Sequence, residues 1–230
     1  MWKQMIAAAA FLLTSVTVSA SSFVAGQHYD VVADKPTQQA EVREFFSFYC
    51  PHCYHFEPVL KNVVQQLPKD TAVVKNHVDF LGFAPTEVQT AITRGFVAAV
   101  ALGKGPEAAD VLFKSIHEKG ARPANEADVR TILLSIGLDA AKYDETLHSS
   151  SVNSTVGDMQ FQQGYWSKAV VSTPTPMLSM MLNNDQPKPV LSGVPALIIN
   201  GKYKVNLAAL DANNIEQQLA ELVKFLLTNP

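Results

Sequence analysis

The sequence predicts an α/β fold in which one β-sheet is interrupted by an inserted block of α-helices. Short runs of β-branched and aromatic residues occur toward both ends of the chain, whereas residues 83–170 show the apolar spacing of helices. The chain has 230 residues, of which 47% are hydrophobic, so it can bury a sizeable core. Strands on both sides of a helical block therefore favour a single, interrupted sheet over separate domains.

The N-terminal part of the chain predicts three strands and one helix. Residues 29–32 form the first predicted strand, and the aromatic-rich residues 42–49 form the second, buried one. The helix follows at once, because apolar residues from Phe56 to Leu67 recur at helical offsets and Pro68 ends the pattern. The alternating residues 71–80 then predict a third strand.

The remainder predicts the helical block and the return to the sheet. Helices are expected to begin at Thr86, Pro106, Asn125, Asp139 and Val152, with glycines after the first three. Strand character returns at residues 194–199, and a hairpin turn at residues 200–201 leads to residues 203–205. An apolar stripe then predicts a last helix, capped by one of two adjacent asparagines, Asn213 or Asn214.

Residues 1–20 have the pattern of a signal peptide. A short positive start precedes an apolar stretch, and Val18-Ser19-Ala20 provides small residues for cleavage. We therefore expect export, into a compartment where disulfides persist. The chain carries 18 basic and 21 acidic residues without a basic block, which argues against a nucleic-acid partner.

Both cysteines of the chain belong to one motif, Cys50-Pro51-His52-Cys53. The motif lies where the second strand meets the helix, so Cys50 is placed at the helix start. The free N–H groups and the positive dipole end there favour a thiolate, and His52 can add a donor or a positive charge. Both effects lower the pKa of Cys50 and make it the nucleophile, while Cys53, one turn deeper, is expected to be the resolving cysteine.

Two other interpretations of the cysteines are open at this point. A structural disulfide across a four-residue loop would restrict little chain entropy and so would stabilise the fold weakly. A zinc or copper site could use the two sulfurs with His52 and His55, but structural zinc needs four ligands and no second paired motif is present. We expect no metal and no dissociable cofactor.

Glu44 stands alone among the apolar residues of the second predicted strand. Because an unpaired buried carboxylate is costly, we expect a partner, and Lys75 on a neighbouring strand is the candidate. The alternative is an edge position at which Glu44 meets water. If the pair lies below the cysteines, it could tune proton transfer to Cys53.

Four segments, in the same order along the chain, resemble the DsbA family of bacterial periplasmic thiol:disulfide oxidoreductases. They are residues 44–57 around the cysteines, 75–80, 193–196 with Val194-Pro195, and 200–203. The resemblance implies a thioredoxin fold interrupted by an inserted α-helical domain. The expected parts are a signal peptide (1–20), the first thioredoxin-like part (21–82), the helical domain (83–170), an extra loop (171–190) and the second thioredoxin-like part (191–230).

The resemblance also implies an activity and partners. The protein would donate its Cys50–Cys53 disulfide to reduced exported polypeptides through a mixed disulfide, and a DsbB-like quinone-linked membrane oxidase would reoxidise it. It would act in the periplasm, as a monomer, with a strongly lowered pKa at its first cysteine and an oxidising disulfide. A disulfide isomerase or reductase of the same fold is the nearest alternative, and a non-catalytic metal-binding or substrate-binding module is the alternative from another class.

Residue roles follow from the same resemblance. Cys50 would be the exposed, attacked cysteine and Cys53 the resolving one, with Pro51 between them and His52 stabilising the Cys50 thiolate. Pro195 would be a cis-proline facing the disulfide. The supporting residues would be Val194 before that proline and the charged residues Glu44, Lys75 and Glu57 on the buried side of the site.

Residues 171–190 depart from the family pattern, because about twenty residues with prolines at both ends and methionines in the centre are added there. A surface loop with a short apolar plug is one interpretation. A lip beside the cysteines that alters recognition of substrate or oxidase is the second, and copper binding through methionine is the third.

Overall fold

The computed structural model describes residues 23–171 and 188–229. Its five-stranded sheet has the order β1-β5-β4-β2-β3. The parallel pair is β2 with β3, and the other neighbours are antiparallel. The strands are β1 (Tyr29–Val31), β2 (Glu41–Phe46), β3 (Ala72–His77), β4 (Ala196–Ile199) and β5 (Tyr203–Val205). Because β4 and β5 pair with strands from the other end of the chain, the predicted interrupted sheet is confirmed.

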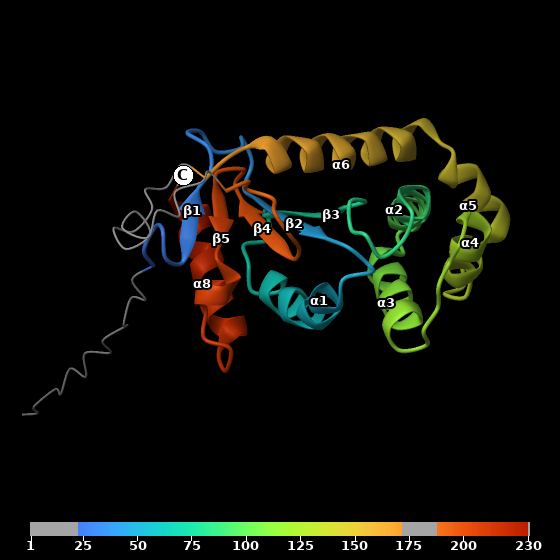
Figure 1. Cartoon of the computed structure of the whole chain (residues 1–230), viewed down its shortest axis with the longest axis horizontal. Helices are drawn as coiled ribbons and strands as arrows, with labels where there is room; N and C mark the ends of the chain where they lie inside the picture. The colour runs from blue at the N-terminus through green and yellow to red at the C-terminus, as the bar shows by residue number, and fades with distance from the viewer. Residues whose placement is uncertain (1–22, 172–187, 230) are drawn as a thin grey trace, which may run out of the picture.

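Helices cover both faces of this sheet. Helices α1 (Pro51–Val64) and α8 (Ile215–Thr228) pack side by side on one face, over Val42, Leu197 and Ile199. The opposite face carries Phe45 and Ile198, which pack with Trp166 near the end of α6 (Ser150–Lys168). The two faces alternate along β2 as a pleated strand requires. Figure 1 shows α1 and α8 on one side of the strands and α6 on the other.

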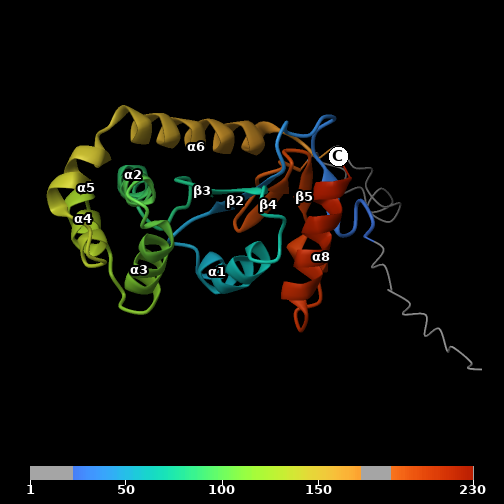
Figure 2. The same ribbon diagram turned by 180° about the vertical axis from the view of Figure 1, so that it is seen from behind.

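The helices between β3 and β4 form a second body of the fold. They are α2 (Thr86–Ala101), α3 (Gly105–His117), α4 (Glu126–Leu134), α5 (Ala140–Leu147) and α6. Figure 2 shows α2 to α5 grouped beyond the end of the sheet, with α6 running back along it. Their core includes Phe96 and Phe113 and continues into Phe48 and both cysteines. The helical block is therefore packed directly against the cysteine motif.

Two of the side-chain caps lie where the sequence predicted them, whereas α6 begins at Ser150 after the cap Ser149 and not at the predicted Val152. Asn125 and Asp139 are N-caps, and each accepts a backbone N–H of the first turn through its side chain. The expected start of α2 at Thr86 is right, but its N-cap is Pro85 and no side chain caps it. The final helix begins after Asn214, one of the two predicted caps, again without a side-chain bond.

Strands β2 and β3 each end three residues earlier than predicted, and hydrogen bonds explain why. β2 ends at Phe46 because Ser47 turns the chain: its carbonyl accepts the N–H of Cys50 at 3.0 Å and its hydroxyl that of Tyr49 at 3.2 Å. β3 ends at His77, and the N–H of Asp79 bonds to the Gln163 side chain at 2.9 Å instead of to a strand. Aromatic composition extends past both points, so the sequence pattern overestimates the strands.

The connections that follow the helical block agree with the predictions that fall on described residues. Asn200 and Gly201 both have positive φ, 52° and 59°, as the predicted hairpin turn requires. The Val194–Pro195 bond is cis, as expected. The predicted signal peptide and residues 172–187 of the added loop lie outside the described residues. Within residues 23–171 and 188–229, no helix is long and apolar enough to cross a membrane.

Candidate active site

The turn at Ser47 delivers Cys50 to the N-cap of α1. Cys50 has extended backbone angles, and its sulfur accepts the N–H of Cys53 at 3.2 Å. Pro51 follows within the first turn of the helix, where a missing N–H costs nothing. A sulfur atom thus takes the place that a Ser or Asp oxygen takes at an ordinary N-cap, and helix N–H groups point at it.

The two sulfurs differ strongly in proton affinity. The pKa of Cys50 is lowered to about 6, and the hydrogen bond from the Cys53 thiol is the largest cause. The backbone N–H groups of Cys53 and His52 and the charge of His52 also lower this pKa, whereas burial raises it. The same thiol–thiol bond, followed by burial, raises the pKa of Cys53 far above its ordinary value. Both cysteines are free thiols in this structure, and the predicted order of their pKa values is confirmed.

Cys50 is less exposed than the family resemblance implied. The residue exposes 5% of its surface and Cys53 none, whereas Pro51 and His52 between them are exposed. The segment before β4 covers Cys50, since the carbonyl oxygen of Val194 lies 3.4 Å from Cys50 Sγ. This contact comes from Val194, the residue before the cis-proline, and the expectation that Pro195 faces the cysteines stays a prediction. The expectation of an exposed Cys50 is wrong for this dithiol form.

A charged triad lies on the buried side of the cysteines. Lys75 Nζ is 2.6 Å from Glu44 Oε2 and 2.5 Å from Glu57 Oε2. Glu44 and Lys75 are register partners on β2 and β3, and Glu44 is fully buried. The predicted Glu44–Lys75 pair is therefore confirmed, and the edge position is excluded.

Burial and ion pairing act in opposite directions on the pKa values of Glu44 and Lys75. Burial raises the pKa of Glu44 even though Lys75 acts in the opposite direction. Burial also opposes the charge on Lys75, but the two carboxylates outweigh it, and its pKa is raised. The charge of Glu44 contributes to the raised pKa of Cys53, so the triad and the inner sulfur are electrostatically coupled.

Two histidines near the site were missed from the sequence. His77 on β3 is buried, with Nδ1 2.7 Å from the Thr93 hydroxyl and its ring stacked on Phe48. Burial lowers the pKa of His77 to about 3, so its ring is neutral. His117 ends α3 and lies with Nε2 2.9 Å from the carbonyl oxygen of Phe48. Both contacts are tertiary, and no local pattern marks these residues.

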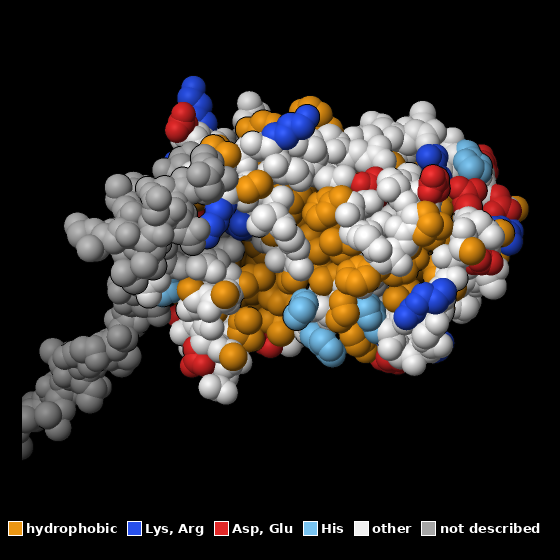
Figure 3. Space-filling view, viewed as in Figure 1, with side chains coloured by type: hydrophobic (Ala, Val, Ile, Leu, Met, Phe, Trp, Pro, Cys, Tyr) orange, Lys and Arg blue, Asp and Glu red, His pale blue; other side chains and the backbone are white. Residues whose placement is uncertain are grey.

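The surface around the cysteine motif is apolar. Figure 3 shows hydrophobic side chains gathered across the middle of this face, with imidazole rings along their lower margin. In the loop after β3, Phe80 and Phe83 are exposed, while Leu81 packs against the core cluster that includes Val78 and Ile198. Among the described residues, no group of three or more His, Cys, Asp or Glu is placed to hold a metal ion.

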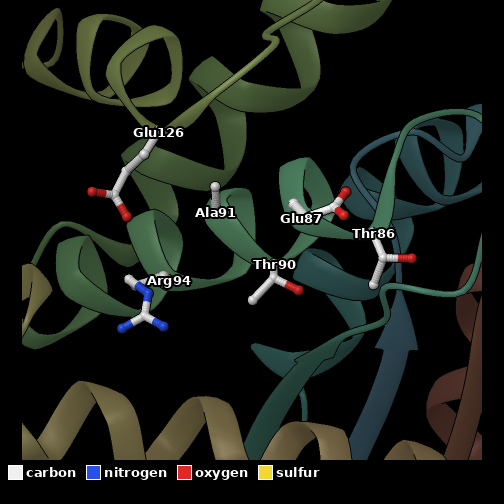
Figure 4. Close-up of a pocket in the computed structure, with 6 residues that line it drawn as sticks. All are labelled: Thr86, Glu87, Thr90, Ala91, Arg94 and Glu126. Atoms are coloured by element: carbon white, nitrogen blue, oxygen red, sulfur yellow. The ribbon is translucent and has the colours of Figure 1, made fainter.

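A separate hollow of about 420 Å³ lies on the helical block. Figure 4 shows its lining residues on α2 and at the start of α4: Thr86, Glu87, Thr90, Ala91, Arg94 and Glu126. Arg94 donates a hydrogen bond to the side chain of Asn153. None of the residues of the cysteine site lines this hollow.

A thiolate-forming cysteine at the start of a helix, with its partner one turn later and the carbonyl that precedes a cis-proline beside it, places the protein among the thiol:disulfide oxidoreductases of thioredoxin-like fold. Comparison with known proteins supports that class. Residues 41–165 match the family profile described as DSBA-like thioredoxin domain. The chain belongs to this DsbA family.

Individual relatives agree over nearly the whole chain. The thiol:disulfide interchange protein DsbA of Dickeya dadantii is 33% identical over 98% of this chain and 99% of its own. Among solved structures, a complex of Proteus mirabilis DsbA with the non-covalently bound peptide PWATCDS is 29% identical, with a TM-score of 0.70 over 90% of this chain and 100% of that one. A second structure of the Proteus mirabilis enzyme is 30% identical, with a TM-score of 0.68 over 90% of this chain and 98% of that one.

Proposed function

We propose that the protein is an exported dithiol oxidase that transfers its Cys50–Cys53 disulfide to reduced polypeptides. The observation that carries this proposal is the pKa of about 6 at Cys50, beside a Cys53 thiol that keeps its proton. A thiolate that is stable in the reduced protein is a good leaving group, and its stability makes the disulfide form the stronger oxidant.

The reaction follows from this difference between the sulfurs. A substrate thiolate attacks Cys50 Sγ of the disulfide; the Cys50–Cys53 bond breaks, and Cys53 leaves and takes up a proton. A mixed disulfide then joins Cys50 to the substrate. The second substrate thiolate attacks the substrate sulfur of that bond and releases Cys50 as a thiolate. Two electrons pass from the substrate to the protein, and the substrate gains one disulfide.

The supporting residues have distinct roles in the proposal. Pro51 and His52 shape the turn, and His52 stabilises the Cys50 thiolate. Val194 and Pro195 form the wall opposite Cys50, where the substrate chain would lie. Glu44, with Lys75 and Glu57, exchanges the proton that Cys53 takes up, because burial keeps its pKa raised and its charge acts on Cys53.

Partners and location complete the proposal. The substrate would be a reduced exported polypeptide, which fits the apolar face around the cysteines and the cysteine-containing peptide bound by the Proteus mirabilis relative. A DsbB-like quinone-linked membrane oxidase would reoxidise the pair. The protein would reach the periplasm through the signal peptide of residues 1–20 and act there as a monomer.

The test is disulfide transfer to a reduced two-cysteine peptide, followed by mass spectrometry. The oxidised protein should release a peptide lighter by two hydrogens and become a dithiol itself, and Cys50→Ser should abolish both changes. The equilibrium of the Cys50–Cys53 pair with glutathione should lie toward the dithiol. A glutathione equilibrium that lies strongly toward the disulfide would contradict the oxidase function and indicate a reductase. Tightly bound stoichiometric metal with slow disulfide exchange would indicate a metal carrier.

The role of Glu44 has its own test. Glu44→Gln keeps the size and removes the charge, so the rate at which a substrate thiolate displaces Cys53 from Cys50 to form the mixed disulfide should change and lose part of its pH dependence. If the exchange rates match those of the parent protein from about pH 5 to about pH 8, a range that spans the Cys50 pKa, the proton-transfer role is excluded and the oxidase function is not affected.

A further inference from the structure

The helical block reaches the cysteine motif through His117, a residue to which the proposed mechanism gives no role. His117 Nε2 is 2.9 Å from the carbonyl oxygen of Phe48, two residues before Cys50. Because a carbonyl oxygen only accepts, the proton of this bond belongs to the imidazole. Phe48 is fully buried, and a buried carbonyl that loses its donor is costly. The bond thus ties the segment before Cys50 to the end of α3.

The same imidazole holds the segment after Cys53. The ring of Tyr54 stacks on His117 with centroids 5.0 Å apart and planes 12° from parallel. The Tyr54 hydroxyl donates to Glu118 Oε1 at 2.6 Å, so a second contact with the end of α3 maintains the stack. His117 therefore touches the chain on both sides of the four-residue motif.

We propose that His117 is a positioning residue that keeps the Cys50 turn in the geometry that stabilises the thiolate. The Cys53 N–H reaches Cys50 Sγ at 3.2 Å only while the chain approaches α1 along its present path. Phe48 sets that path before the motif and Tyr54 sets the first helical turn after it. A freer turn lengthens the bonds to the sulfur, so the thiolate loses stability and the disulfide becomes a weaker oxidant.

The experiment compares two substitutions of His117 by their effect on the cysteines. His117→Leu removes both the donor and the aromatic stack, whereas His117→Gln restores an N–H donor. For His117→Leu we expect a raised Cys50 pKa, measured by thiolate absorbance, and a shift of the glutathione equilibrium by about three- to tenfold toward the oxidised protein, the size of one lost hydrogen bond. His117→Gln should recover part of both shifts.

A matched control is His148→Leu, because His148 follows α5 and has a side chain that is 64% exposed. It should leave the Cys50 pKa and the equilibrium unchanged. If His117→Leu destabilises the oxidised and reduced proteins equally and changes neither cysteine readout, the residue is merely structural and the inference is overturned. If His117→Leu does not fold, Tyr54→Leu, which removes the stack and the Tyr54–Glu118 hydrogen bond but keeps the His117–Phe48 bond, must shift both readouts in the same direction, and unchanged values overturn the inference.

This inference rests on the proposed function, but the two fail differently. A parent protein that transfers no disulfide contradicts the proposed function whatever the variants do. A parent protein that transfers its disulfide normally, with His117 variants of unchanged Cys50 pKa and glutathione equilibrium, contradicts only the positioning role.

Discussion

The sulfur atoms of Cys50 and Cys53 are joined by a thiol–thiol hydrogen bond and belong to one helical turn, yet their surroundings differ. Cys50 accepts N–H groups at the helix start, whereas Cys53 is fully buried and lies within the field of Glu44. Motif spacing was enough to predict the order of the two pKa values, because that order follows from the position of each residue in the helix. The depth of Cys50 was not predictable, since it depends on Val194 from a distant segment.

The first prediction concerns the pH dependence of Cys50 in the reduced protein. Alkylation by iodoacetamide requires the thiolate, so its rate should rise with pH and level off above a midpoint near 6, where the Cys50 pKa lies. The fitted midpoint from stopped-flow or quenched alkylation is the measurement. Cys50→Ser should remove this transition. A midpoint near 9, the ordinary value for a thiol, would contradict the prediction.

The second prediction concerns Lys75, which holds the buried carboxylate of Glu44. Lys75→Met leaves a buried charge without its partner, so the free energy of unfolding should fall by about 3–5 kcal/mol at neutral pH in urea denaturation. Because burial raises the pKa of Glu44 above its ordinary value of 4.5, protonation of Glu44 should reduce this loss as the pH falls toward 4.5.

The control for Lys75→Met is the double variant Glu44→Leu, Lys75→Met. It removes the buried charge together with its partner and should be less destabilised than Lys75→Met alone. Equal stability losses in the two proteins, or a Lys75→Met loss that does not depend on pH, would show that lost packing and not the unpaired charge is responsible.

Among the elements, α2 shows how closely the helical block is packed. Gly95 lies in the middle of this helix, and a Cβ placed there would come within 2.8 Å of Leu133, 2.9 Å of Tyr143 and 2.9 Å of Val129. These neighbours belong to α4 and α5. The glycine is therefore required for contact between helices, not for an unusual backbone conformation.

The third prediction follows from this contact. Gly95→Ala gains helix propensity of about 1 kcal/mol, but the clash costs about 1–3 kcal/mol and should outweigh it, so the midpoint of urea unfolding falls. The matched control is Gly157→Ala in α6, where nothing lies within 4 Å of the added Cβ and the midpoint should rise. If Gly95→Ala also raises the midpoint, the close approach of α4 and α5 is not real.

Element order and type could be predicted from the sequence, whereas several element ends could not. Apolar periodicity located the strands and helices, and side-chain caps such as Asn125 fixed helix starts. The ends of β2 and β3 depend on hydrogen bonds to Ser47 and Gln163, and Gln163 is 84 residues from its partner Asp79. The Gln163 bond is long-range and leaves no periodic signature in the sequence, whereas the Ser47 turn is local but is hidden by the aromatic residues that continue past it.

At the scale of the whole molecule, the site exists because three distant parts of the chain meet. Cys50 comes from the β2–α1 junction, Val194 from the segment before β4, and His117 from the end of α3. The first two were expected from the sequence and from the family resemblance. His117 was not expected, because the helical periodicity of a sequence does not show which polar residue of a helix faces a neighbouring part of the fold.

His77 links the sheet to the helical block and should also govern the stability of the whole molecule in acid. Its ring lies between β3 and α2, bonded to Thr93, and burial holds its pKa at about 3. The unfolded chain binds a proton at this residue below its ordinary pKa of 6.5, whereas the folded protein does not until about 3. Acid therefore favours the unfolded chain throughout this interval.

The fourth prediction is that this histidine contributes a loss of stability as the pH falls from 6.5 toward 3, amounting to about 4–5 kcal/mol over the full interval. His77→Gln, which keeps a polar partner for Thr93, should lower stability at pH 7 but flatten the decline in acid, measured by urea denaturation at each pH. His148→Gln, at an exposed position, should keep the parent slope. Parallel pH profiles for the parent and His77→Gln would mean that the buried ring does not exclude the proton, and the acid sensitivity would then belong to the carboxylates alone.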